Sequence, residues 1–266
     1  MLSDPLVKNN VTVVNNDSKG RTIIFAHGFG TDQNAWKEVS TAFANDHRMV
    51  LYDNVGAGKA QPEAFSPNRY DSLHSYADDL VEICAALDVK DAIMVGHSVS
   101  GMISLLAAIK QPDLFSEMIL VGASPRYLND DGYVGGFDQP SLNGLYDAMA
   151  NNYYAWVSGF APAAMANPDR PELAMGFAET LSAIRPDIAQ SVARVIFQSD
   201  HRADLHKLNK RTLLLQTKHD IAVPMQVAEY LARNIGNSTM HVVDAEGHFP
   251  HISAAKEIIR EIRNFI

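Results

Sequence analysis

The chain alternates between short runs of consecutive apolar residues and longer segments in which apolar residues recur every three or four positions. A continuous apolar run is typical of a parallel strand buried on both faces, and the wider spacing is typical of a helix that covers a sheet. We expect strands over residues 11–14, 22–26, 49–52, 92–96, 118–121, 212–216 and 240–243. Their alternation with helices predicts an α/β protein with a doubly wound, mostly parallel sheet.

This alternation stops after the strand at Leu120 and resumes near residue 205. The intervening segment has helical patterns over 142–149, 173–184 and 188–197, and it is rich in proline and aromatic residues. We expect it to cover the carboxyl edge of the sheet, because ligands of open α/β sheets bind at that edge. The sequence therefore predicts a core of residues 1–123 and 205–266. It also predicts a helical cap of residues 124–204, inserted after the sixth strand of the fold.

The strand predicted over 92–96 leads into a sharp turn at Ser98 and then into a helix. A serine at a strand-to-helix turn exposes its hydroxyl, and backbone strain of about 1–3 kcal/mol is typical of functional positions. Gly96 precedes the serine by two residues, as in the G-x-S-x-G motif, but Ser100 stands where the second glycine belongs and Gly101 follows it. We interpret Ser98 as a nucleophile, and we expect the Ser100 side chain to lie along the helix face.

A serine nucleophile needs a base, which is in turn oriented by a carboxylate. In proteins that have this strand-to-helix serine turn, the three catalytic residues occur along the sequence in the order serine, acid, histidine. Asp220 follows the strand predicted over 212–216, and His248 follows the last predicted strand. All three residues lie beyond the carboxyl ends of strands, so we expect Ser98, Asp220 and His248 to meet at one edge of the sheet.

Five neighbouring residues offer alternatives to this triad. Asp244 and Glu246 could replace Asp220 as the acid, but they share a loop with the base and would have to fold back on it. His219 and His251 are expected to be exposed loop histidines. His97, beside the serine, is expected to pack or to form a hydrogen bond rather than to catalyse.

Acyl transfer also requires donors for the developing oxyanion. In this fold one donor is the backbone N–H of the residue after the serine, which is Val99 here. The second comes from the loop after an early strand, and we expect it to be the N–H of Phe29. Gly28 and Gly30 permit the turn that this role requires.

Composition narrows the function further. The 266 residues are 47% hydrophobic and carry a formal net charge of −9, which argues against nucleic acid and anionic membranes as partners. The single cysteine, Cys84, lies in an amphipathic helical pattern and excludes an internal disulfide. The histidines show no metal-ligand spacing, and Gly56 and Gly58 do not complete a dinucleotide-binding motif, so we expect neither metal nor cofactor. The absence of a signal-like or membrane-spanning segment predicts a cytoplasmic protein.

Several motifs resemble one subgroup of α/β-hydrolases, and the resemblance covers nearly the whole chain. These motifs occupy residues 28–33, 51–58, 95–100, 124–130, 135–137, 185–189 and 197–200. The subgroup contains the bacterial stress-response activator RsbQ and the plant karrikin and strigolactone receptors. With Ser100 at the position of the missing glycine, this chain resembles the plant receptors. The resemblance implies a cap of four helices over a closed apolar pocket with an intact triad. Carried over by motif, the pocket is lined by Phe29, Tyr127, Phe137, Leu145, Trp156, Phe160, Phe177, Ile196 and Phe197.

Three functions remain open. The first is slow hydrolysis of a small hydrophobic ester or lactone, linked to signal perception as in RsbQ-like regulators and butenolide receptors. Its output would pass through a partner such as a sensor-domain phosphatase or another signalling protein. The second is a metabolic carboxylesterase without a signalling partner, and the third is a binding protein that does not catalyse.

Overall fold

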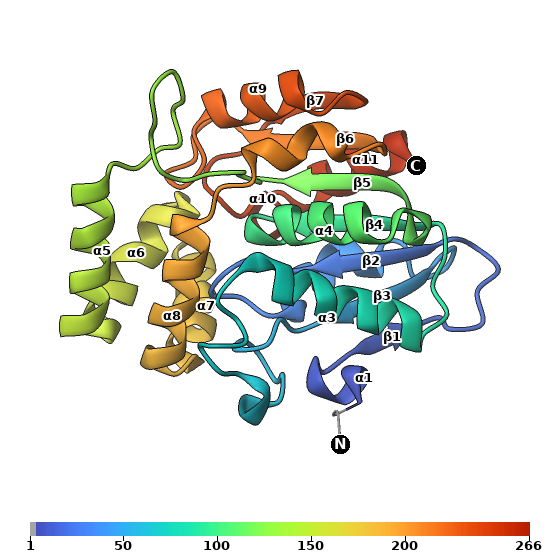
Figure 1. The fold of residues 1–266 in the computed structure, drawn as a ribbon, viewed down its shortest axis with the longest axis horizontal. Coiled ribbons are helices and arrows are strands. Elements are labelled where there is room, and N and C mark those ends of the chain that lie inside the picture. Colours follow the sequence, from blue (N-terminus) through green and yellow to red (C-terminus); the bar gives the residue numbers. More distant parts are fainter. Residues whose placement is uncertain (1–3) are drawn as a thin grey trace.

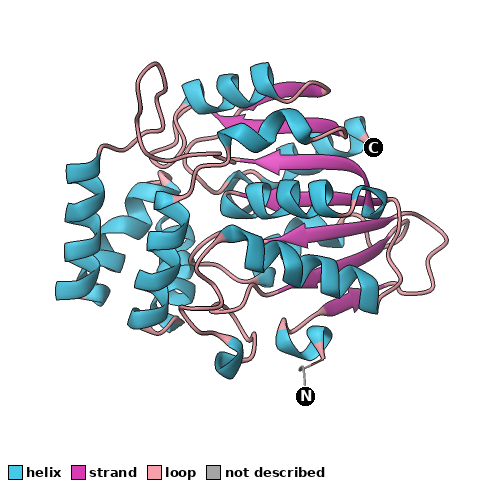
Figure 2. Cartoon of the chain, in the orientation of Figure 1, coloured by secondary structure: helices cyan, strands magenta, loops and turns pink. Residues whose placement is uncertain are grey.

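Seven strands form one sheet in the computed structural model, which describes residues 4–266 (Figure 1, Figure 2). They are β1 (Thr12–Val14), β2 (Thr22–Ala26), β3 (Arg48–Tyr52), β4 (Ala92–His97), β5 (Phe115–Val121), β6 (Arg211–Thr217) and β7 (Ser238–Val243). Their order is β1-β3-β2-β4-β5-β6-β7; β1 is antiparallel to β3, and each other pair in this order is parallel. The predicted α/β fold with a mostly parallel sheet is confirmed.

Helices cover both faces of this sheet, because successive strand residues point to opposite sides. Ile24 of β2 packs in a buried cluster with α3 (Leu73–Ala86), α4 (Val99–Lys110) and α9 (Met225–Asn234). The next residue, Phe25, packs on the other side with η1 (Gln33–Trp36), α2 (Lys37–Thr41) and α11 (Ala255–Phe265). Figure 1 shows α3, α4 and α9 in front of the strands. Burial of both faces explains why the central strands are continuous apolar runs.

Several other helices of residues 4–266 are short. They are α1 (Pro5–Lys8), η2 (Pro62–Ala64), η3 (Pro112–Leu114), η4 (Arg202–Lys207) and α10 (Pro250–Ser253).

Among residues 4–266 no helix has the length and apolar character needed to cross a bilayer.

Four helices lie between β5 and β6 and gather at one end of the sheet (left in Figure 1). They are α5 (Gln139–Asn151), α6 (Tyr153–Met165), α7 (Pro171–Ala183) and α8 (Pro186–Gln198). Prolines occupy the first turn of α5, α7 and α8, where a missing N–H costs nothing. Several of the prolines that interrupt the sequence pattern therefore begin helices. The limits of the cap at residues 124 and 204 stay a prediction.

The position of this insertion corrects one detail of the sequence prediction. The four helices follow β5, the fifth strand of the described chain, and not a sixth strand. The strand itself is the predicted one, ending at Val121, so the strand count alone was wrong. Before β1, residues 5–8 form the helix α1, because Pro5 occupies its first turn and the Asp4 carboxylate accepts a hydrogen bond from the N–H of Leu6.

The four helices share the hydrophobic core of the sheet. Tyr146 and Leu181 belong to the same buried cluster as Ile24 and the helices α3 and α4. Thr180 of α7 also donates a hydrogen bond from its hydroxyl to the carbonyl oxygen of Gly30 at 2.8 Å. The insertion is thus held on the carboxyl edge of the sheet by apolar packing and by polar contacts to the loop after β2.

Candidate active site

Ser98 stands at the sharp turn between β4 and α4, with φ 55° and ψ −124°. The left-handed φ is strained for a serine and points to a functional constraint. A Cβ at Gly96 would lie 2.6 Å from the carbonyl oxygen of Ser100, so the turn closes only over glycine. A Cβ at Gly101 would lie 2.5 Å from the Cβ of Ala123, which explains why the displaced glycine of the motif stands at 101.

Ser98, His248 and Asp220 form one hydrogen-bonded chain. The distance from Ser98 Oγ to His248 Nε2 is 2.8 Å, and that from His248 Nδ1 to Asp220 Oδ2 is 2.7 Å. The second carboxylate oxygen of Asp220 accepts hydrogen bonds from the N–H groups of Ala222 and Val223 at 2.8 and 3.1 Å. A carboxylate held in this way selects the imidazole tautomer with hydrogen on Nδ1, which leaves Nε2 free to accept the serine proton.

The alternative acids are engaged by other side chains. Asp244 pairs with Lys218, and Glu246 accepts a hydrogen bond at 2.8 Å from Nδ1 of His219. His219 is exposed, as its loop position predicts. Asp220 is the carboxylate that contacts the imidazole of His248.

The expectation that His251 is exposed is wrong. Its side chain is completely buried in α10, with its ring 4.3 Å from those of both Trp36 and His97. Burial lowers the pKa of His251 to about 3, so its imidazole is neutral. The short helix α10 turns this residue inward, which the loop composition does not indicate.

His97 forms a hydrogen bond, as expected. Its Nε2 donates to the carbonyl oxygen of His248 at 2.7 Å. Burial holds the pKa of His97 well below its usual range, so the ring is neutral with its proton on Nε2. The residue before the nucleophile therefore ties the β4 turn to the loop that carries His248.

Two backbone N–H groups flank the nucleophile. Val99 is the first residue of α4, where helical N–H groups have no partner within the helix. The loop after β2 passes close by, because a Cβ at Gly28 would lie 3.1 Å from the Cβ of Ser98. Within residues 4–266, the N–H groups of Phe29 and Val99 donate to no backbone carbonyl outside the helices and strands. The oxyanion role of these two N–H groups stays a prediction.

Comparison with known proteins places this arrangement in a family. The family model described as alpha/beta hydrolase fold matches residues 21–255. The chain belongs to the alpha/beta hydrolase family. It is 45% identical to the "Karrikin insensitive 2 receptor CA" of Petunia hybrida over 90% of this chain and 89% of that one. It is 44% identical to "Strigolactone esterase D14" of Arabidopsis thaliana over 96% and 94%.

The same relationship appears in three dimensions. A solved hydrolase from Oleispira antarctica superposes on this hydrolase with a TM-score of 0.94 and 33% identity, covering 98% of this chain and 96% of that one. The resemblance to the karrikin and strigolactone receptor subgroup is confirmed.

In this α/β hydrolase the hydroxyl of Tyr127 lies 3.3 Å from Ser98 Oγ. The family resemblance assigned Tyr127 to the pocket wall, and its contact with the nucleophile is an addition from the structure. Burial raises the pKa of Tyr127, so the phenol keeps its proton and can donate to Ser98. No local pattern indicates this contact, since it depends on how the chain after β5 returns over the turn.

Most of the aromatic residues assigned to the pocket pack in two groups, one around Tyr127 and one that reaches from α6 to the loop carrying His248. The ring of Phe197 lies 5.1 Å from that of Tyr127 and 5.4 Å from that of Phe137. Further along the cap, Trp156 stacks on Phe160 at 4.9 Å. Phe160 lies 6.1 Å from Phe177, which lies 4.3 Å from Phe249, the residue after His248. Leu145 packs against the same core.

A narrow, mostly apolar cavity of about 30 Å³ lies beside the turn of Ser98 and the loop after β2. Of the residues assigned to the pocket, Phe29 and Ile196 line this cavity, together with Val99. The other walls come from the loops after β2 and β3, from α3, α4 and α8, and from Ile184 between α7 and α8. The side chains from the three helices include Leu73, Tyr76, Ile103, Ala189 and Val192. These residues were not predicted from the sequence, because their side chains reach the cavity only after the helices have packed.

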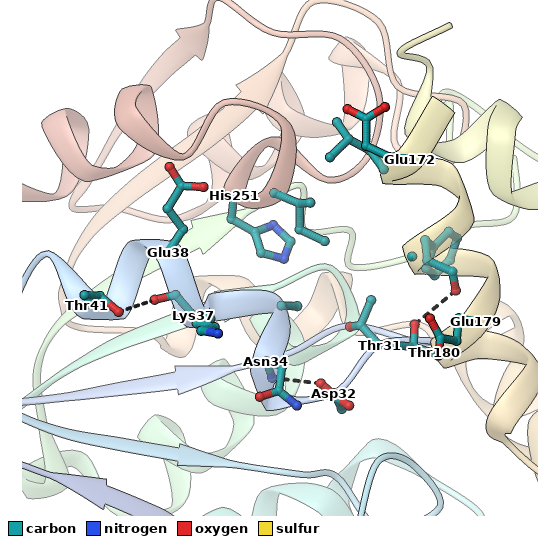
Figure 3. A pocket seen from close by; sticks show the side chains of 15 residues that line it. Thr31, Asp32, Asn34, Lys37, Glu38, Thr41, Glu172, Glu179, Thr180 and His251 are labelled. Carbon is teal, nitrogen blue, oxygen red and sulfur yellow. Dashed lines mark hydrogen bonds between the residues drawn. The ribbon is translucent and has the colours of Figure 1, made fainter. Parts of the chain in front are cut away.

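A larger groove of about 750 Å³ lies outside the hydrogen-bonded chain, between η1, α2 and α7 (Figure 3). Phe177, assigned to the ligand pocket, contributes to this groove, and the buried His251 lies at its inner wall. Ser98, His248 and Asp220 do not line it. In the part of the chain that the structure describes, no group of three or more histidine, cysteine or acidic side chains is arranged to hold a metal ion.

Proposed function

We propose that this α/β hydrolase cleaves a small hydrophobic ester or lactone, with Ser98 as nucleophile, His248 as general base and Asp220 as the orienting acid. The unbroken hydrogen-bonded chain from Asp220 through His248 to Ser98 carries the proposal. A serine hydroxyl is a weak nucleophile at neutral pH, and a base within hydrogen-bond reach activates it.

The reaction follows from this geometry. Ser98 Oγ attacks the carbonyl carbon while its proton passes to Nε2 of His248, and Asp220 stabilises the resulting imidazolium. The N–H groups of Phe29 and Val99 receive the negative charge on the carbonyl oxygen. The tetrahedral intermediate then expels the leaving oxygen, which takes the proton from Nε2. Water, deprotonated by the same imidazole, then attacks the acyl carbon. The second tetrahedral intermediate releases the acid as Ser98 Oγ leaves and takes the proton back from Nε2.

We further propose that turnover is slow and linked to perception of the ligand. The names of the relatives support this, because they describe karrikin receptors and a strigolactone esterase. The two aromatic groups, one around Tyr127 and one from α6 to the loop carrying His248, support an apolar ligand. Output would then pass through a partner in the cytoplasm, such as a sensor-domain phosphatase in an RsbQ-like system or another signalling protein.

Hydrolysis of a butenolide and of a p-nitrophenyl ester by the full chain, beside Ser98→Ala, tests the proposal. We expect turnover far below about 10 per second, the median of ordinary enzymes. We also expect its loss in Ser98→Ala and a ligand-induced shift of the melting temperature. Fast turnover of simple esters would favour a metabolic carboxylesterase, and ligand binding without hydrolysis would favour a binding protein. Full activity in Ser98→Ala would refute Ser98 as nucleophile.

A further inference from the structure

We infer that His27, Asn54, Ser100 and Thr31 form a clamp that positions the oxyanion donor of Phe29. The inference rests on the proposed function, because it concerns the same reaction. It gives Ser100, the residue that departs from the G-x-S-x-G motif, a specific task.

The clamp acts on the peptide unit between Gly28 and Phe29. The carbonyl oxygen of Gly28 and the N–H of Phe29 belong to one planar trans peptide, so fixing the direction of the C=O fixes the opposite direction of the N–H. Nδ1 of His27 lies 2.8 Å from this carbonyl oxygen, and the hydroxyl of Thr31 donates to the same oxygen at 3.1 Å. These two hydrogen bonds to the Gly28 carbonyl therefore fix the direction of the Phe29 N–H on the opposite side of the same peptide.

The tautomer of His27 is set by its second nitrogen. The backbone N–H of Asn54 donates to Nε2 of His27 at 3.0 Å, so Nε2 carries no proton and Nδ1 is the donor. Burial lowers the pKa of His27, which keeps the imidazole in this neutral form. Asn54, in the loop after β3, thus keeps the His27 proton on Nδ1, from which it is donated to the carbonyl oxygen of Gly28.

Ser100 and Asn54 hold the other end of His27. The Ser100 hydroxyl donates to the carbonyl oxygen of His27 at 2.5 Å and accepts a hydrogen bond from the Asn54 side chain at 3.2 Å. That side-chain amide also donates to the His27 carbonyl at 3.1 Å. Ser100 is completely buried, and it points to the loop after β2 from the first turn of α4. A glycine at position 100 would leave the His27 carbonyl with one donor fewer.

All four side chains act through the backbone N–H of Phe29, so they are positioning residues. Loss of a whole oxyanion donor lowers kcat by about 10²–10³-fold, and a misaligned donor loses part of that effect. We expect Ser100→Gly and Thr31→Val each to lower kcat for a p-nitrophenyl ester by about 10- to 100-fold, with KM changed by less than about threefold.

Ser104→Ala is the matched control. Ser104 lies one turn further along α4, is equally buried and donates to the carbonyl of Ser100 at 2.5 Å, so its hydroxyl bonds within the helix and not to the loop after β2. We expect this variant to keep kcat, whereas general loosening of α4 would lower kcat in both serine variants.

A second readout separates positioning from structural damage. An aryl trifluoromethyl ketone forms an oxyanion adduct with an active serine, and its carbinol analogue cannot. We expect Ser100→Gly and Thr31→Val to weaken ketone binding in parallel with kcat while carbinol binding is unchanged. Unchanged kcat in both folded variants, or equal weakening of ketone and carbinol, would overturn the inference. If Ser100→Gly does not fold, Thr31→Val decides; full activity of Ser98→Ala would instead refute the proposed function.

Discussion

Gly247 couples the catalytic loop to the cap, and replacing it with alanine should damage both. Its φ is +83°, and an added Cβ would lie 2.1 Å from the carbonyl oxygen of Met165 at the end of α6. The neighbouring His248 donates its backbone N–H to the carbonyl of Ala164 at 2.8 Å. Any shift that relieves the clash therefore moves the cap away from the base.

The expected cost has two parts. A residue with a Cβ at a left-handed φ costs about 1–2 kcal/mol. The clash with a backbone oxygen adds to this, because backbone atoms cannot move aside as a flexible side chain can, and we expect Gly247→Ala to lower the free energy of unfolding by about 3–4 kcal/mol in all. For a chain of this size each kcal/mol corresponds to roughly 2–4 °C, so the melting temperature should fall by about 6–16 °C.

Two other glycines provide controls. Gly132 has φ +70°, and within residues 4–266 no atom beyond the glycine and its two chain neighbours lies within 4 Å of the place an added Cβ would take, so Gly132→Ala measures the backbone strain alone. Gly236 has no positive φ, and within the same residues an added Cβ there would also meet open space, so Gly236→Ala should be neutral or slightly stabilising. Urea unfolding and kcat would be measured for all three variants. If Gly247→Ala is no less stable than Gly132→Ala and keeps full kcat, the coupling between cap and catalytic loop is refuted.

The triad, two buried histidines and a buried ion pair give three further tests. Asp220→Asn should lower kcat by about 10³–10⁴-fold with little change in stability, because the amide no longer selects the Nδ1–H tautomer of His248; steady-state kinetics and melting curves check this. Acidification below pH 6.5 should destabilise the fold. Burial lowers the pKa of His97 and His251, so these histidines stay neutral in the folded state but bind protons in the unfolded chain. Each histidine contributes up to about 1.4 kcal/mol per pH unit to the loss of unfolding free energy. Between pH 7 and 5 the urea midpoint should therefore fall less steeply in His251→Phe than in the unchanged protein, and an equal slope would contradict this. Lys8→Met should cost about 3–5 kcal/mol, because it removes the ammonium at 2.7 Å from the buried Asp79 carboxylate, which keeps only the Tyr70 hydroxyl at 2.9 Å and the Arg69 guanidinium at 3.5 Å. In urea unfolding Lys8→Met with Asp79→Asn should cost less than Lys8→Met alone, and an equal or larger loss would argue against the pair.

The order of residues along the chain was sufficient to predict most of the fold. Continuous apolar runs identified the central strands, because a parallel strand covered on both faces has no polar side to alternate with. The same reasoning placed Ser98, Asp220 and His248 beyond the carboxyl ends of three strands, since parallel strands end at one edge. They share this edge because β4, β6 and β7 run parallel in one sheet, with only β5 between β4 and β6. Their catalytic roles stay a prediction until the variants are measured.

What the sequence could not provide depends on side chains that meet across distant segments. His251 was expected in solvent but is buried against Trp36, because α10 turns it inward; the contact of Tyr127 with Ser98 likewise depends on the path of the chain after β5. Ser100 departs from a familiar motif in the sequence, and only the packing of α4 against the loops after β2 and β3 gives its hydroxyl partners. Local pattern thus determines which elements form, because periodicity and turns are properties of neighbouring residues. The direction of a hydroxyl or a ring nitrogen is decided by tertiary contacts, because its partners are dozens of residues away.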